Sequence, residues 1–260
     1  MYRQGKYEII KKCAKICTGF DLKIFDFTVR CPEIAVLAKP GQFVQIAAEG
    51  FFLRRPISIC DIDAVNGTIR LVFEVRGKGT LKLSELNEGD FIDIIAPLGN
   101  GFTFLPDKKA VCVGGGIGTP PMLSIARLYG ENAKVISGFR SEPFSILQED
   151  FKAAGCQTIL CTDDGTAGVH GFVTAPLEQM LKTEGVDIIY ACGPMPMLKG
   201  IAELARKYGV RSELSLEQRM ACGVGACLVC ACKTVKNGEQ ILSHVCKDGP
   251  VFDGEEVDFS

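Results

Sequence analysis

The pattern of hydrophobic and polar positions changes near residue 104. Residues 5 to about 103 contain short alternating apolar segments, such as 43–46, 69–75 and 91–95, separated by Gly, Asn, Asp and Pro. Alternation with a period of two is typical of strands that bury one face. We therefore predict an antiparallel β-barrel or sheet over residues 1–103.

From Lys109 onward, apolar strands alternate with helices. Strands are predicted at 110–113, 134–139, 158–162, 187–192 and 210–216, and helices at 120–129, near 145–154, near 174–182 and near 197–208. A glycine stands where each predicted helix must end, which is a common way to terminate a helix. This alternation predicts an α/β domain with a parallel sheet over residues 104–213.

The last segment, residues 214–260, carries the most specific motif of the chain. Its spacing is Cys222-x4-Cys227-x2-Cys230-x15-Cys246, which follows the ligand pattern of a plant-type [2Fe–2S] cluster. Gly223 and Gly225 allow the loop to curl tightly and to turn backbone N–H groups toward the sulfurs. Structural zinc also binds four thiolates, but usually from two short Cys pairs. We therefore predict a small plant-ferredoxin-type [2Fe–2S] module.

Three other side chains are not expected to bind the cluster. Cys232 lies two residues after Cys230, and we expect it on the opposite side of an extended segment. His244 lies two residues before Cys246, where it could form a hydrogen bond near the cluster. His170 falls in the turn 168–171, which favours a loop role.

Two glycine-containing turns follow predicted strands of the α/β domain. The first spans residues 113–121 and the second spans residues 192–195. At the carboxyl edge of a parallel sheet such turns allow a pyrophosphate to approach the backbone and the helix N-termini. The first turn is not a G-x-G-x-x-G fingerprint, because Thr119 replaces the third glycine. Together they predict a dinucleotide site formed by Gly114, Gly115, Gly116, Gly118, Thr119, Cys192, Gly193 and Pro194.

The first module has two basic segments, Arg54-Arg55-Pro56-Ile57-Ser58 and Arg76-Gly77-Lys78-Gly79-Thr80. Guanidinium groups, hydroxyls and a glycine turn could together hold a second phosphate group. Each segment alone is weak evidence, because arginines on a barrel surface usually face solvent.

Composition excludes several classes of function. The net charge of −2 and a pI near 5.8 provide no basic surface for nucleic acid or an anionic membrane. Thirteen cysteines would suggest disulfides in a secreted protein. The N-terminal sequence MYRQGKYEII, however, lacks the apolar core of a signal peptide. No run approaches the length of a membrane span. We therefore expect a cytoplasmic protein in which Cys112, Cys161 and Cys192 are reduced core residues.

The segments RPIS, GGGIGTPP and CGP, in this order and spacing, resemble the ferredoxin–NADP reductase superfamily, in which an FAD-binding β-barrel precedes a nicotinamide-binding domain. With the C-terminal cysteine motif, essentially the whole chain resembles the electron-transfer subunits of class 1B, NAD-dependent dihydroorotate dehydrogenases. The resemblance implies NAD at the glycine turns and the cluster on the four cysteines. It implies FAD at Arg55, Pro56, Ile57, Ser58, Val72, Phe73, Glu74, Gly79 and Thr80.

The resemblance also implies a partner. In that family an FMN-containing catalytic subunit oxidises dihydroorotate in de novo pyrimidine (UMP) biosynthesis, and two copies of each chain form a heterotetramer. Electrons then pass through the [2Fe–2S] cluster and FAD to NAD⁺, with FAD converting between one-electron and two-electron transfer. We expect no general acid or base in this chain, and the pyrimidine site is expected on the partner.

Two alternatives differ in partner or in class. The chain could be the flavin and iron–sulfur subunit of a sulfide dehydrogenase or of an NADH-dependent ferredoxin:NADP oxidoreductase, although four cysteine ligands favour the dihydroorotate interpretation. It could instead be a non-catalytic zinc-binding interaction module. The preference for NAD over NADP is not settled by the residues, since Arg140 could meet a 2′-phosphate and Glu142 could accept ribose hydroxyls. The role of Asp163 and Asp164, beyond capping a turn, is also open.

Overall fold

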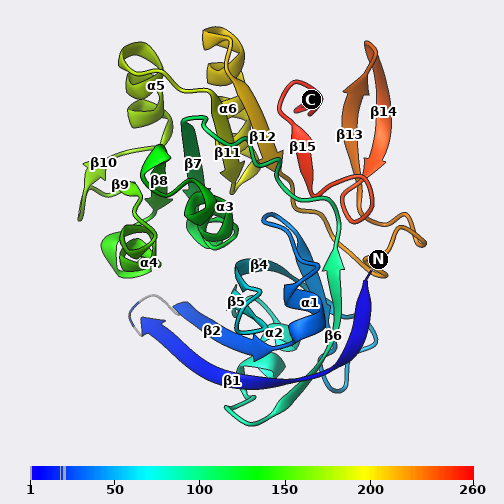
Figure 1. Cartoon of the computed structure of the whole chain (residues 1–260). Coiled ribbons are helices and arrows are strands. Elements are labelled where there is room, and N and C mark those ends of the chain that lie inside the picture. The colour runs from blue at the N-terminus through cyan, green and yellow to red at the C-terminus, as the bar shows by residue number, and fades with distance from the viewer. Residues whose placement is uncertain (1, 18, 20–21) are drawn as a thin grey trace.

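The computed structural model describes residues 2–17, 19 and 22–260 (Figure 1). Within them the first half of the chain forms a closed antiparallel barrel with the strand order β1-β2-β5-β4-β3-β6. The strands are β1 (Arg3–Cys17), β2 (Leu22–Arg30), β3 (Phe43–Ile46), β4 (Arg55–Asp63), β5 (Thr68–Glu74) and β6 (Phe91–Leu98). The predicted antiparallel barrel is confirmed.

Alternating side chains of the barrel strands fill its interior. Phe27 and Phe73 are almost completely buried, and their rings meet edge to face with centroids 5.2 Å apart. Two short helices, α1 (Pro32–Ala35) and α2 (Lys78–Ser84), each contribute buried side chains to the same core. The segment expected as a basic turn is therefore the first turn of α2, and the Thr80 hydroxyl accepts hydrogen bonds from the N–H groups before it.

The second half is built on a mixed sheet with the order β10-β9-β8-β7-β11-β12-β15. Its parallel strands are β7 (Ala110–Gly115), β8 (Ala133–Phe139), β9 (Gln157–Thr162), β10 (Val169–His170), β11 (Ile188–Cys192) and β12 (Arg211–Ser215). The helices are α3 (Pro121–Tyr129), α4 (Gln148–Ala153), α5 (Thr174–Thr183) and α6 (Met195–Tyr208), with 3-10 turns η2 (Gly116–Gly118), η3 (Gly130–Asn132) and η4 (Glu142–Phe144). The predicted parallel α/β domain is confirmed.

One predicted helix is shorter than expected, and one residue lies in a different element. The helix expected near residues 145–154 begins only at Gln148, because Leu147 adopts a left-handed conformation with φ +63° that a continuous helix cannot contain. His170 is not in a loop but in the short strand β10, which pairs with β9 in parallel register. Elsewhere the observed element ends lie within a few residues of the predicted ones.

The C-terminal segment is tied to the α/β sheet. After β12 a long loop leads to the antiparallel hairpin of β13 (Ala231–Lys236) and β14 (Glu239–His244), and β15 (Val251–Asp253) then pairs with β12. The expected domain boundary at residue 213 falls inside β12. Phe252 and Val257 pack in one core with side chains of α6 and β11. The three-domain division remains a proposal, in which the third part shares its core with the second.

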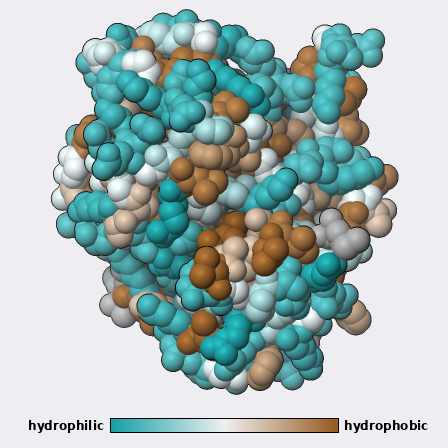
Figure 2. Space-filling model, viewed as in Figure 1, coloured by the Kyte–Doolittle hydropathy of each residue, from teal (hydrophilic) through white to brown (hydrophobic). Residues whose placement is uncertain are grey.

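The barrel and the α/β domain share a buried interface. Cys60 of β4 and Val72 of β5 pack in one core with residues of α3 and β7. The guanidinium of Arg70 binds the carboxylates of Asp26 in the barrel and Asp150 in α4. Figure 2 shows hydrophobic side chains gathered across the middle of this face, at the level where Figure 1 places the junction of the two halves. Charge pairing and apolar burial therefore fix the two domains against each other.

None of the helices formed by the described residues is long and apolar enough to cross a membrane.

Candidate iron–sulfur, flavin and nicotinamide sites

The fold brings the four cysteines of the spacing motif together. Cys222, Cys227 and Cys230 lie in the loop between β12 and β13, and Cys246 follows β14. The Sγ atoms of Cys230 and Cys246 are 3.2 Å apart, and the side chains of Cys227 and Cys222 are joined by a hydrogen bond. The sulfurs therefore form two pairs, and among the described residues no three His, Cys, Asp or Glu side chains come together closely enough to hold a single metal ion.

Backbone N–H groups surround these sulfurs, as the glycines predicted. The N–H groups of Val224, Ala226 and Cys227 lie 3.3–3.4 Å from the Sγ of Cys222. The N–H of Gly225 lies 3.1 Å from the Sγ of Cys246. Gly223 and Gly225 have φ angles of +72° and +82°, which only glycine adopts readily. The loop is thus shaped to stabilise negative charge on sulfur.

The same groups set the acidity of the thiols. Burial opposes ionisation of Cys222, but the N–H groups of Val224, Cys227 and Ala226 outweigh it and lower the pKa of this thiol to about 6. Burial and the neighbouring Cys230 raise the pKa of Cys246 to about 12. A metal must therefore displace a proton from Cys246, whereas the Cys222 thiolate is available near neutral pH.

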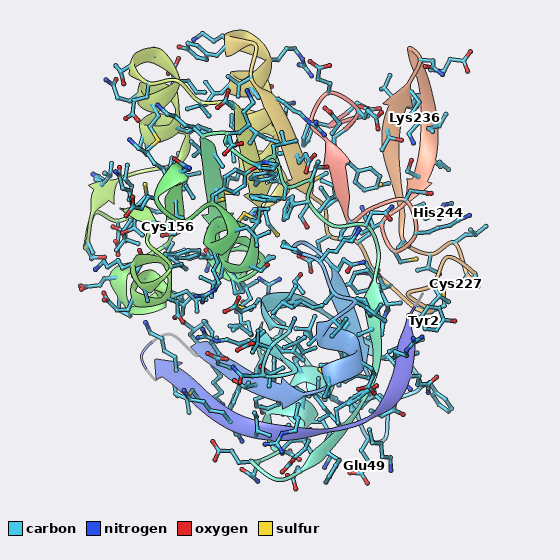
Figure 3. The ribbon with its side chains drawn as sticks, viewed as in Figure 1. Tyr2, Glu49, Cys156, Cys227, Lys236 and His244 are labelled. Carbon is cyan, nitrogen blue, oxygen red and sulfur yellow. The ribbon has the colours of Figure 1, made fainter. Side chains whose placement is uncertain are left out.

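The cysteine loop has one exposed and one buried side. Cys227 is exposed on the rim of the molecule (Figure 3), beside Val224, Leu228 and Val229, whose exposed fractions are 38%, 58% and 54%. Cys230 and Cys246 are buried in the core shared with the α/β sheet. His244 Nδ1 lies 3.6 Å from Asp248 Oδ2, so this ring is directed to a carboxylate.

Cys232 does not point away from Cys230 as expected, because residues two apart in a strand face the same side. Cys232 lies in β13 opposite Ser243 and is buried in the same core as Cys230. Burial raises the pKa of the Cys232 thiol to about 11. Within the described residues no backbone N–H group bonds its sulfur, in contrast to Cys222, Cys230 and Cys246. That Cys232 is not a ligand remains a prediction, now based on this difference.

The two basic segments of the barrel meet as predicted. A Cβ atom at Gly79 would lie 2.6 Å from Arg55 Cζ, so the guanidinium occupies the space that a larger residue at position 79 would need. Arg55 also lies over the ring of Phe51, 5.0 Å from its centroid. Arg54, in contrast, forms an ion pair of 2.9 Å with Asp93 and is committed to the barrel. Of these two arginines, Arg55 therefore remains the proposed phosphate-binding residue.

The other predicted FAD residues of the barrel strands lie in β4 and β5, close to Arg55. Pro56, Ile57 and Ser58 continue β4, and Val72, Phe73 and Glu74 end the neighbouring strand β5. The side chains of Val72 and Phe73 are buried, so only their backbone edge could reach a ligand. Their assignment to FAD stays a proposal.

The two glycine turns of the α/β domain are in contact. A Cβ atom at Gly118 would lie 2.6 Å from the carbonyl carbon of Cys192, and one at Gly193 would lie 3.1 Å from the Cα of Gly115. Pro194 immediately precedes α6, whereas Thr119 is fully buried behind the first turn, against Gly114. Both turns lead into helix N-termini at the carboxyl edge of the sheet, and η2 contacts β5 of the barrel. The proposed nicotinamide turns and FAD strands thus meet.

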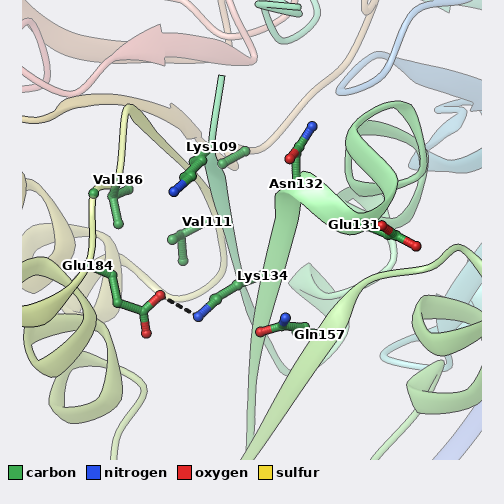
Figure 4. A pocket seen from close by; sticks show the side chains of 10 residues that line it. Lys109, Val111, Glu131, Asn132, Lys134, Gln157, Glu184 and Val186 are labelled. Carbon is green, nitrogen blue, oxygen red and sulfur yellow. Dashed lines mark hydrogen bonds and ion pairs between the residues drawn. The ribbon is translucent and has the colours of Figure 1, made fainter. Parts of the chain in front are cut away.

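A separate hollow of about 240 Å³ lies at the opposite edge of the sheet (Figure 4). It is lined where β7, β8 and β9 begin, and Lys134 forms an ion pair there with Glu184. Neither glycine turn contributes to its lining. The hollow therefore does not fit the predicted dinucleotide.

One residue near the cysteine loop, Gln45, was not predicted from the sequence to belong to a site. Gln45, in the middle of β3, is fully buried and lies against Gly223. The sequence signal for this residue was a glutamine between apolar residues in the segment Phe-Val-Gln-Ile. Alternation alone assigns this glutamine to the outward face of the strand.

Comparison with known proteins relates the chain to one family. A family model described as the iron–sulfur cluster binding domain of dihydroorotate dehydrogenase B matches residues 217–258. The chain is 43% identical over 222 residues to a dihydroorotate dehydrogenase B (NAD(+)) electron transfer subunit from Caldanaerobacter subterraneus subsp. tengcongensis, covering 85% of this chain and 87% of that one. Its counterpart from Geobacillus kaustophilus is 40% identical over 244 residues, covering 90% and 93% of the two chains.

A solved structure extends the similarity to the complete fold. It comes from work on flavin-based electron bifurcation by an NADH-dependent reduced ferredoxin-NADP oxidoreductase. The two structures align with a TM-score of 0.84 and 34% sequence identity, covering 97% of this chain and 90% of the other.

Proposed function

The chain belongs to the family of electron transfer subunits of NAD-dependent dihydroorotate dehydrogenase B, and from this premise we propose how its three sites work with a catalytic partner. The subunit carries FAD and a [2Fe–2S] cluster and transfers electrons to NAD⁺ in pyrimidine synthesis. The proposed partner contains FMN and oxidises dihydroorotate, and two copies of each chain form a heterotetramer.

The two-sided cysteine loop carries this proposal. Its exposed side combines Cys227 with the apolar residues Val224, Leu228 and Val229. Apolar residues grouped on a surface are typical of a protein interface. Its buried side adjoins the barrel through Gly223, which lies against Gln45. Electrons from a docked partner would therefore enter at the rim and leave toward the FAD strands.

The residues of this chain hold and orient the cofactors. When bound, nicotinamide exchanges hydride, the cluster exchanges single electrons, and FAD converts between the two. The backbone N–H groups around Cys222 and Cys246 stabilise thiolates, and Arg55 supplies positive charge beside Gly79. The turns at Gly118 and Gly193 let a dinucleotide approach the N-termini of α3 and α6. None of these roles needs an acid or base.

An anaerobic titration of the purified chain with NADH tests the cofactor assignment. We expect FAD and about two irons per chain, the content of one [2Fe–2S] centre, and we expect NADH to bleach both absorbances. Zinc in place of iron, with no flavin response, would support the zinc-binding interaction module instead. NADPH that reduces the flavin as efficiently as NADH would contradict the NAD preference.

Co-expression tests the proposed partner. The chain is produced together with an FMN-containing dihydroorotate dehydrogenase subunit, and the complex is sized and supplied with dihydroorotate and NAD⁺. We expect a complex of two chains of each kind that forms NADH. A chain that reduces NAD⁺ with ferredoxin but not with dihydroorotate would favour the second candidate, a ferredoxin:NADP oxidoreductase subunit, which the 34% identical solved structure suggests.

A further inference from the structure

Gln45 is a buried amide without a partner. The residue has no exposed surface, and among the described residues neither Oε1 nor Nε2 forms a hydrogen bond. Leaving such a group unpaired is unfavourable, because it has given up its hydrogen bonds to water. Buried polar groups without partners are rare, and a redox role or a bound ion is among the explanations for them.

The side chain of Gln45 leaves the barrel on the side of the cysteine loop. Val44 and Ile46, its neighbours in β3, both belong to the barrel core. Phe43, two residues away and thus on the same face as Gln45, belongs to the other core, which also contains Cys230 and Cys246. Strand alternation therefore directs the amide out of the barrel and toward the proposed cluster ligands.

The amide lies against the loop itself. A Cβ atom at Gly223 would be 2.6 Å from Cγ and 2.7 Å from Nε2 of Gln45. Gly223 is buried and directly follows Cys222. The backbone N–H groups that bond the Cys222 sulfur come from Val224, Ala226 and Cys227 of the loop. Gln45 thus adds a side-chain donor from the barrel, beside the first of the four cysteines.

Gln45 also adjoins the proposed FAD segment. Its Cα partner across the β3–β4 ladder is Pro56, and Phe43 is paired with Ser58 in the same way. A single residue of β3 therefore contacts the cysteine loop through its side chain and the FAD strand through its backbone.

We propose that Gln45 is a positioning residue for electron transfer, whose side-chain N–H donates a hydrogen bond to a cluster sulfur on the Cys222 side. This inference rests on the cluster assigned to Cys222, Cys227, Cys230 and Cys246 above. Reduction adds negative charge to the cluster, so a donor at this position stabilises the reduced form and raises the reduction potential. The same bond fixes the loop against the strand that leads to FAD.

Redox titration of the whole complex tests the proposal, with the reduced cluster followed by EPR. Gln45→Met keeps the side-chain length but removes the donor, and Gln45→Glu replaces the donor by a carboxylate. Loss of one charge-assisted bond changes the ratio of oxidised to reduced cluster about tenfold at a fixed potential, which is about 59 mV for one electron. We expect both variants to shift the cluster to lower potential by about this amount or more.

Gln42→Met is the matched control. The Gln42 amide donates to the carbonyl of Gly99 at 2.6 Å and accepts from the N–H of Lys39 at 2.8 Å, so its polar atoms already have partners. We expect this variant to keep the wild-type cluster potential. A Gln45→Met potential equal to the wild type, at full iron content, would overturn the proposal.

A second measurement tests the hydrogen bond in the wild-type protein, in which no side chain has been altered. Pulsed EPR of the reduced protein, labelled with ¹⁵N in glutamine side chains, should show a weak nitrogen coupling that persists in Gln42→Met and disappears in Gln45→Met. Absence of this coupling in the wild type would refute the hydrogen bond even if the variants lose iron. A wild-type chain without iron would instead overturn the cluster assignment, and the inference with it.

Discussion

The guanidinium of Arg55 occupies the space where a side chain at Gly79 would begin, because a Cβ atom there would lie 2.6 Å from both Cζ and Nη2. Arg55 starts β4 and Gly79 lies in the first turn of α2, so the barrel brings together two segments separated by more than twenty residues. The missing side chain at position 79 therefore leaves room for the guanidinium, a group that can bind phosphate through two hydrogen bonds.

Gly79→Ala should weaken FAD binding with little loss of stability. The added methyl displaces a flexible guanidinium rather than backbone, so folding is not blocked. Misplacing one charge-assisted contact predicts a rise in the FAD Kd of about tenfold. Fluorescence titration of the apoprotein with FAD measures this. Gly185→Ala is the control, because nothing lies within 4 Å of its added Cβ; an equal loss in both variants would contradict the role of Arg55.

Cys227→Ser should abolish or severely weaken the cluster, whereas Cys232→Ser should leave it intact. Cys227 belongs to the pair with Cys222, while the Cys232 sulfur receives no backbone N–H bond within the described residues. Iron analysis and the visible absorbance of anaerobically purified protein compare the two. Iron missing from Cys232→Ser protein that still binds FAD would show that the ligand set is wrong.

Gly118→Ala should impair the use of NADH more than the binding of FAD. The new methyl would lie 2.6 Å from the carbonyl carbon of Cys192 and 2.8 Å from the Cα of Gly193, and backbone atoms cannot yield as a flexible side chain can. Separating the two turns by this contact should raise the KM for NADH about tenfold, the effect of a loss of about 1.4 kcal/mol. Stopped-flow reduction of the flavin measures it. A normal KM would place the nicotinamide elsewhere.

Glu178 should stabilise the fold in a pH-dependent way. Hydrogen bonds from Lys207 and Tyr208 of α6 lower the pKa of this carboxyl from 4.5 to about 2. Because the folded pKa is below the unfolded one, the stabilisation is complete above about pH 4.5 and is lost as the pH falls toward about 2. Urea unfolding of the wild type and Glu178→Gln should therefore differ at pH 7 and converge at acidic pH.

Glu203→Gln provides the reference for that comparison. Glu203 lies on an exposed face of α6, and no ion pair is seen for it in the described part of the chain. Its substitution should leave the unfolding free energy nearly unchanged at either pH. A Glu178→Gln deficit that stayed constant down to about pH 2 would contradict the assigned pKa.

The sequence by itself determined the architecture and the four cysteines. The period-two segments before residue 104 and the strand–helix alternation after it are local patterns, and each is set by which side chains a strand or helix must bury. The first three cysteines, Gly223 and Gly225 likewise lie within one short loop, so the N–H groups directed at the Cys222 sulfur could be predicted from the loop alone, whereas Cys246 joins the loop only through the β13–β14 hairpin.

The tertiary structure alone decided which distant groups meet. Closure of the barrel places Arg55 against Gly79 and commits Arg54 to Asp93, although the two arginines are adjacent in the chain. Pairing of β15 with β12 attaches the cysteine module to the α/β sheet, so a boundary drawn from sequence pattern falls inside a strand. The burial of Gln45 against Gly223 depends on both events. Such contacts join segments far apart in the chain, and local periodicity carries no information about them because they arise only when whole elements pack.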